Sequence, residues 1–100
     1  MNIVYPYMSK NIDNNQETLI EFPCDFFIKV IGMMKENFTQ SIIDEIQEID
    51  QTFNASKVDI QPSQHGKYIS LTCKVFVISK NQLDLIYSKL SSHPDTKFVI

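Results

Sequence analysis

The sequence predicts one α+β domain, and three observations favour this fold class. Runs of β-branched and aromatic residues typical of strands alternate with two stretches whose apolar residues recur at helical spacing. A chain of 100 residues suffices for one two-layer core but not for two. The composition, 43% hydrophobic and 21% charged, is that of an ordinary globular protein. We therefore expect a single domain over residues 19–100, preceded by a flexible polar extension over residues 1–18.

The first half of this domain reads as a strand followed by a helix. The run from Phe26 to Ile31 is strand-like and meets Gly32, which we interpret as the breaker that ends it. Asn37 and Gln40 have the spacing of a capping box and predict the helix start, with a start two residues earlier as the alternative. The apolar stripe of the helix comprises Phe38, Ile42, Ile43, Ile46, Ile49 and Phe53. Its other side is expected to be a solvated acidic face of Asp44, Glu45, Glu48 and Asp50.

The second half repeats the pattern after an additional strand. A strand over residues 57–61 is followed by a turn whose motif residues are Pro62, Ser63 and Gly66, with glycine suited to a positive φ. The longest strand then runs over residues 68–77. A capping box of Ser79 and Gln82 begins the second helix, and residues 97–100 form the last strand. The stripe of this helix is Leu83, Ile86, Tyr87 and Leu90.

The element order is therefore β-α-β-β-α-β. With right-handed crossovers, this order gives a ferredoxin-like βαββαβ plait, in which a four-stranded antiparallel sheet of order 4-1-3-2 carries both helices on one face. The first and third strands are then central, and the second and fourth are edges.

Strand alternation predicts which side chains turn away from the helices. Facing the helices we expect Phe26, Ile28, Val30, Val58, Ile60, Ile69, Leu71, Cys73, Val75, Phe98 and Ile100. The opposite face should carry Lys57, Asp59, Gln61, Thr72 and Val99 together with a candidate interaction surface. This surface consists of Phe27, Lys29, Ile31, Tyr68, Ser70, Lys74, Phe76 and Lys97.

Several motifs resemble those of the YbeD-like family of small uncharacterised bacterial proteins. They are Glu21-Phe22-Pro23 with Phe26, Lys29 and Gly32, then Pro62-Ser63, Gly66, Tyr68 and Ser70, then Leu85-Ile86-Tyr87 with Leu90, and the ending Lys97-Phe98-Val99-Ile100. The resemblance implies the same plait, similar to regulatory domains of the ACT type, which bind amino acids or other small effectors between paired plaits. The polar extension is longer than is usual in the family, and His65 stands where lysine is common.

The sequence offers no support for catalysis, a metal or a cofactor. It holds no nucleophilic triad spacing and no glycine-rich phosphate loop, and its two histidines and two cysteines form no ligand cluster. Taking the first and third strands as parallel neighbours offsets Cys24 and Cys73 by about 16 Å, too far for a disulfide. All nine basic residues are lysine and the net charge is −3, which argues against duplex DNA binding.

We expect a cytoplasmic, non-enzymatic module, because the sequence shows no membrane-spanning run and no signal layout. Its role would be regulation or protein interaction, with a homodimer and an ACT-like small effector both open. Exposed apolar patches often mark interfaces with another protein or a second copy. The weaker alternative is single-stranded RNA, stacked on Phe27, Tyr68 and Phe76 among the lysines, although no RNP-like motif is present. In a third interpretation the N-terminal extension itself covers the surface.

Overall fold

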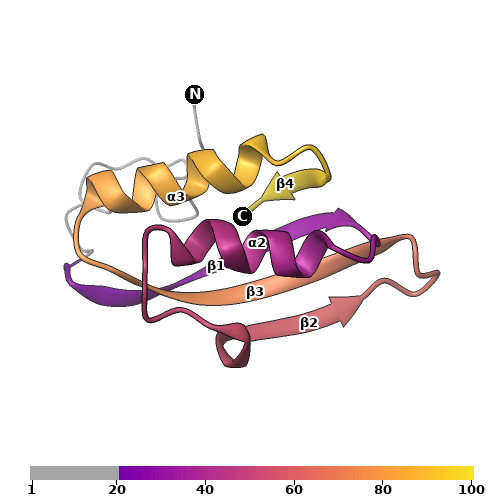
Figure 1. Ribbon diagram of the computed structural model, residues 1–100, viewed down its shortest axis with the longest axis horizontal. Coiled ribbons are helices and arrows are strands. Elements are labelled where there is room, and N and C mark those ends of the chain that lie inside the picture. Colours follow the sequence, from indigo (N-terminus) through magenta and orange to yellow (C-terminus); the bar gives the residue numbers. More distant parts are fainter. Residues whose placement is uncertain (1–20) are drawn as a thin grey trace.

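The computed structural model describes residues 21–100. The predicted extension over residues 1–18 lies outside the described residues, and so does the interpretation that it covers the surface. Figure 1 shows the helices lying in one layer over the sheet. The elements, in chain order, are β1 (Cys24–Met33), α2 (Phe38–Gln47), the short 3-10 helix η2 (Ala55–Lys57), β2 (Val58–Pro62), β3 (Tyr68–Val77), α3 (Lys80–Ser92) and β4 (Thr96–Val99).

The sheet has the strand order β2-β3-β1-β4, and every pairing is antiparallel. This confirms the predicted α+β plait and its order. The assumption that β1 and β3 run parallel is wrong, since Cys24 lies opposite Val77 and Cys73 lies opposite Ile28. Both cysteines are nevertheless free, as expected. Four residues of strand, roughly 13 Å, separate the two positions, which exceeds the reach of a disulfide.

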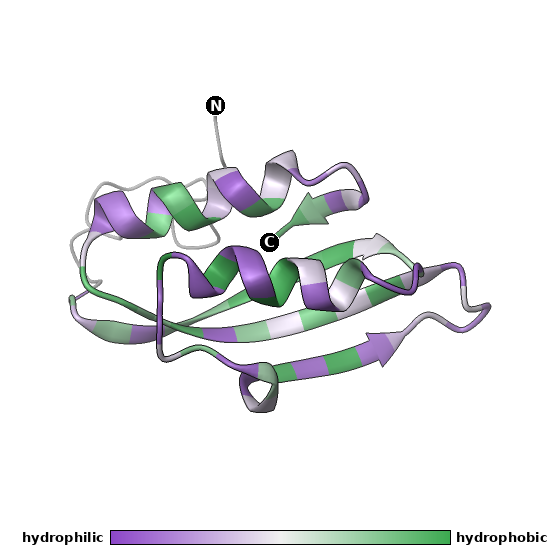
Figure 2. Ribbon diagram, viewed as in Figure 1, coloured by the Kyte–Doolittle hydropathy of each residue, from purple (hydrophilic) through white to green (hydrophobic). Residues whose placement is uncertain are grey.

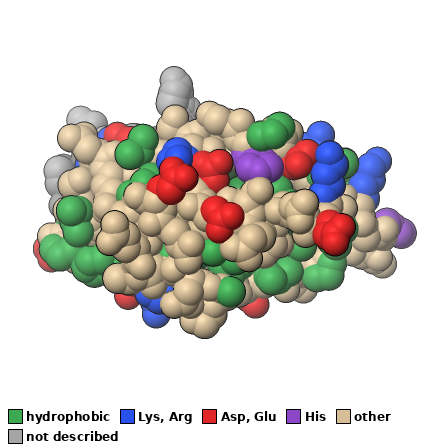
Figure 3. Space-filling view, in the orientation of Figure 1, with side chains coloured by type: hydrophobic (Ala, Val, Ile, Leu, Met, Phe, Trp, Pro, Cys, Tyr) green, Lys and Arg blue, Asp and Glu red, His purple; other side chains and the backbone are tan. Residues whose placement is uncertain are grey.

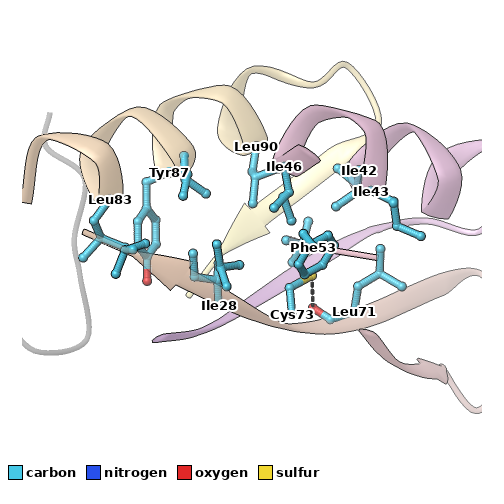
Figure 4. Packing of buried hydrophobic residues seen from close by; sticks show 14 of the residues in the cluster. Ile28, Ile42, Ile43, Ile46, Phe53, Leu71, Cys73, Leu83, Tyr87 and Leu90 are labelled. Atoms are coloured by element: carbon cyan, nitrogen blue, oxygen red, sulfur yellow. Dashed lines mark hydrogen bonds between the residues drawn. The ribbon is translucent and has the colours of Figure 1, made fainter. Parts of the chain in front are cut away.

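The core lies between the helices and one face of the sheet. Figure 4 shows side chains of α2 and α3 pointing toward Ile28, Leu71 and Cys73 of the central strands. Tyr87, Phe38 and Phe53 are the largest fully buried side chains. Side chains of both predicted helical stripes contribute to this core. Figure 2 shows hydrophobic and hydrophilic residues alternating along β2, which leaves the other face of the sheet more polar at this strand.

The two predicted capping boxes fare differently. Ser79 caps α3, because its hydroxyl accepts a hydrogen bond of 3.1 Å from the Gln82 backbone N–H. The Gln82 side chain accepts from the N–H of Ile78 rather than from that of the cap residue itself. Asn37 is the N-cap residue of α2, which confirms the predicted helix start, but the capping box is wrong: the Asn37 side chain makes no capping bond, and the Gln40 side chain donates to Asp44 instead.

We predict that Ser79→Ala lowers the free energy of unfolding by about 1 kcal/mol, because it leaves the Gln82 N–H without its acceptor. Urea denaturation followed by circular dichroism measures the change. Ser88→Ala, at an exposed position within α3, is the control and should change stability by less than half as much. Equal effects from the two variants would refute the capping role.

Gly32 does not end β1, which continues to Met33. Its role is close packing: a Cβ placed there would lie 2.6 Å from Cε2 of Phe38, in contact with Cζ of the same ring, and 2.8 Å from the carbonyl oxygen of Asp95. The pairing of β1 with β4 is also irregular at this point, between Ile31 and Gly32. Glycine therefore lets the first helix and the last strand approach β1 closely.

Within residues 21–100, neither α2 nor α3 is long and apolar enough to cross a membrane.

Candidate functional site

The sheet face opposite the helices, called the open face below, brings together the side chains that the sequence places there. Cross-strand register aligns Phe27 with Lys74, Lys29 with Thr72, and Ile31 with Ser70. On the other side of β3, Asp59 lies opposite Thr72 and Gln61 opposite Ser70. All eight predicted surface residues lie on this face or line its hollows: Phe27, Lys29, Ile31, Tyr68, Ser70, Lys74, Phe76 and Lys97.

The side chains of β4 point to the opposite faces of the sheet from those predicted. Phe98 pairs with Ile31, and Val99 pairs with the buried Val30, so Phe98 lies on the open face and Val99 packs against the core. Ile100 exchanges two backbone hydrogen bonds with Lys29 and is 46% exposed. The physical reason is the irregular register beside Gly32, where Lys97 is an extra residue and shifts the alternation by one.

Ile60 of β2 is a second departure, since it is 51% exposed although we expected it to be buried. It pairs with Leu71 and therefore points to the helix side, but at the outer edge of the sheet.

The apolar side chains of the open face form two groups at opposite ends of the central strands. The first cluster is Phe27 and Phe76, which are 62% and 39% exposed. The second cluster is Ile31, Tyr68 and Phe98, and these residues surround a hollow of about 480 Å³ together with Lys97. Because exposed aromatic side chains in such clusters are rare on a surface that nothing contacts, both clusters are candidates for binding.

Between the clusters the face is polar and shallowly concave. A hollow of about 330 Å³ lies over β1, β2 and β3, and its polar lining includes Lys29, Asp59, Ser70 and Thr72. A second hollow of about 400 Å³ lies near Phe27, Lys57 and Lys74.

The predicted turn motif forms the rim of the central hollow. Pro62 and Ser63 line it, and the Ser63 hydroxyl accepts a hydrogen bond of 3.1 Å from the Tyr68 N–H. Gly66 has a φ of 72°, as predicted, and its N–H donates to the carbonyl of Ser63. The turn thereby fixes how β2 and β3 meet beside Tyr68.

The lysines of the two faces differ in their partners. On the helix side, Lys89 forms ion pairs with Glu45 at 3.3 Å and Glu48 at 2.8 Å, and Lys35 pairs with Asp95 at 3.1 Å. Among residues 21–100, Lys29, Lys74 and Lys97 of the open face form no ion pair. Figure 3 shows acidic side chains gathered over the helix layer. The open face is therefore the more positive side of the domain.

Titratable groups away from the open face have structural roles. Burial raises the pKa of the Cys73 thiol to about 12, and burial together with the neighbouring Asp25 carboxylate raises that of Cys24. His93 packs edge-on against Phe38, with ring centroids 5.3 Å apart, and its Nδ1 accepts from the Asp95 N–H. The described part of the chain contains no cluster of side chains able to hold a metal ion.

Sequence reasoning missed several residues of the open face, Ile100 among them. Met33 lies opposite Tyr68 and Asp25 opposite Phe76, and both positions would have followed from extending β1 by two residues at each end. Phe98 could not have been found, because no pattern in the sequence marks Lys97 as the extra residue.

Comparison with known proteins gives relatives over nearly the whole chain. The family described as "Protein of unknown function (DUF493)" matches residues 17–100. A UPF0250 protein of Janthinobacterium sp. is 44% identical over 84 residues, covering 84% of this chain and 92% of the relative. A UPF0250 protein of Ralstonia nicotianae is 40% identical over 85 residues, covering 85% and 88%. These matches confirm the resemblance to small uncharacterised bacterial proteins.

Two solved structures are similar in fold. The ACT domain from the GTP pyrophosphokinase of Chlorobium tepidum superposes with a TM-score of 0.60 at 20% identity, covering 77% of this chain and 97% of that one. A solution structure of an H. pylori protein gives a TM-score of 0.65 at 20% identity, covering 99% and 98%. Both confirm the predicted plait, the first of them being an ACT domain, and both show the fold alone.

Proposed function

The chain belongs to the DUF493 family of proteins of unknown function, and on this premise we propose that it is a non-enzymatic interaction module that binds a protein partner on its open face. One observation carries the proposal: the open face combines exposed aromatic side chains with lysines that have no ion-pair partner within residues 21–100. A face of this kind loses water-exposed apolar area and gains charge partners on binding.

The histidines and the cysteines also favour an interaction role over catalysis. The two histidines have no arrangement with a nucleophile, since His93 is engaged with Phe38 and Asp95 and His65 lies exposed in the turn. The pKa of each thiol is raised, that of Cys73 to about 12, so neither cysteine is an activated nucleophile.

The experiment is capture of binding partners from a bacterial lysate on the immobilised full chain. Phe76→Glu places a charge in the first cluster and should abolish capture of any specific partner. Leu85→Glu is the matched control, because Leu85 is an equally apolar and 52% exposed residue on α3. A partner that binds Phe76→Glu as well as the wild type, or that is lost with Leu85→Glu instead, would contradict the proposal.

A small effector is the second candidate, because the hollow of about 330 Å³ is within the size range of ligand pockets and presents both charged and hydroxyl groups. A ligand that binds only the folded chain raises its melting temperature. A thermal-shift screen of amino acids and other metabolites at millimolar concentration should then give a stabiliser whose effect is lost in Thr72→Val. A panel without any stabiliser would argue against the effector.

A further inference from the structure

We propose that the ligand of the open face is an acidic amphipathic helix of a partner protein. This inference rests on the proposed function and specifies the partner's chemistry. It comes from the distribution of charge over the two faces and from the spacing of the two apolar clusters.

The charge of the described residues is divided between the two sides of the domain. Five lysines and two aspartates lie on or beside the open face: Lys29, Lys57, Lys67, Lys74 and Lys97 with Asp25 and Asp59. The remaining described residues hold three lysines and eight acidic residues, and each of those three lysines is ion-paired. An otherwise acidic chain thus offers an unneutralised positive surface, which favours an acidic partner.

The spacing of the apolar side chains suits a helix lying along β1. Phe27 and Ile31 are four residues apart on one face of the strand, about 13 Å. On a helix, apolar side chains seven or eight residues apart share one face and lie about 10–12 Å apart along the axis, close to this distance, so a single apolar stripe would meet both clusters. Lys29 lies between the two contact points, and Lys74 lies beside Phe27, where each can pair with a carboxylate on the flank of the helix.

Single-stranded RNA fits the same face less well. Tyr68 and Phe76 lie at opposite ends of β3, roughly 26 Å apart, so consecutive bases could not stack on both. We therefore treat RNA binding as an outcome of the test.

A second copy of this chain offers a poor ligand for the face. The acidic helix α2 has its apolar stripe buried in its own core, so it presents only polar side chains. An open face bound to the helix layer of another copy would also be a head-to-tail contact, which tends to build open-ended assemblies.

The test uses two synthetic helical peptides of about 14 residues, roughly 21 Å long, with the same leucine stripe. One carries glutamate at its polar positions and the other carries lysine. Binding to the full chain is measured by fluorescence anisotropy at low and high salt. We expect the glutamate peptide to bind at least about tenfold more tightly, with the difference shrinking as salt rises.

Charge-reversal variants locate the site. Lys29→Glu combined with Lys74→Glu should remove the preference for the glutamate peptide. Lys35→Glu combined with Lys80→Glu changes the same total charge on the helix side and should preserve it. Circular dichroism confirms that each variant is folded.

Three results would overturn the inference. These are equal or absent binding of the two peptides, a preference that persists in the Lys29/Lys74 variant, and a single-stranded RNA that binds more tightly than the glutamate peptide. If the glutamate peptide fails while Phe76→Glu still abolishes capture of a protein partner, the proposed function stands and only the acidic-helix inference falls.

Discussion

Gly32→Ala is expected to lower the free energy of unfolding by about 3 kcal/mol or to prevent folding at 37 °C. The added methyl group would meet two obstacles at once. One is the ring of Phe38, which is only 1% exposed and cannot swing away, and the other is the backbone carbonyl of Asp95, 2.8 Å from the new Cβ. Relief therefore requires both α2 and the start of β4 to move outward. Urea denaturation at neutral pH measures the loss.

Gly66→Ala is the control for Gly32→Ala, because it replaces a glycine that has no crowded neighbours. Gly66 has a positive φ but open space around its Cα, so the loss should be about 1 kcal/mol. In the double variant Gly32→Ala/Phe38→Leu, removal of the ring should make the combined loss smaller than the sum of the single losses. The packing explanation is wrong if Gly32→Ala costs no more than Gly66→Ala.

Asp50→Ala is expected to lower the free energy of unfolding by about 2–3 kcal/mol, because one carboxylate satisfies three donors. One carboxylate oxygen accepts from the N–H and the hydroxyl of Thr52, at 3.0 and 2.6 Å, and the other accepts from the N–H of Phe76 at 2.9 Å. Asp50 lies in the loop that follows α2. Its side chain thus ties this loop to β3 at Phe76, outside the stretch of β3 that pairs with β2. Asp44→Ala, at an exposed position of α2, should cost only a few tenths of a kcal/mol.

The same carboxylate makes stability depend on pH. Burial alone would raise the pKa of Asp50, but hydrogen bonds from Thr52 and Phe76 and the nearby Lys57 ammonium outweigh it and hold the pKa below its ordinary value of 3.8. A depressed folded-state pKa contributes stability above about pH 4, and that contribution is lost as the pH falls through the folded-state pKa. Stability of Asp50→Asn should therefore fall less steeply below pH 4 than that of the wild type. Parallel acid unfolding profiles for the two proteins would contradict this account.

The strand order and both helix stripes followed from the sequence because they depend on periodicity, which side-chain burial dictates directly. Asp50 shows where such reasoning ends. We placed it on the solvated acidic side of the first helix, yet it is 5% exposed, because the helix stops at Gln47 and the chain then turns the carboxylate toward β3. Helical periodicity predicts the burial of a side chain only within the helix, and Asp50 lies three residues beyond its end.

The candidate site was predictable on the long strands and not on the short one. β1 and β3 pair over ten residues each without interruption, so alternation places Phe27, Tyr68 and Phe76 correctly. β4 has four residues, and its face depends on a single register shift beside Gly32. That shift is set by tertiary packing among β1, α2 and β4, and tertiary contacts of this kind leave no periodic signal.

Binding on the open face requires that its aromatic side chains are accessible in the whole 100-residue chain. Hydroxyl-radical footprinting of this chain, read residue by residue by mass spectrometry, measures that accessibility. Phe27 and Phe98, 62% and 55% exposed, should be oxidised much faster than Phe53, which is 1% exposed. Protection of Phe27 and Phe98 to the level of Phe53 would contradict binding on the open face.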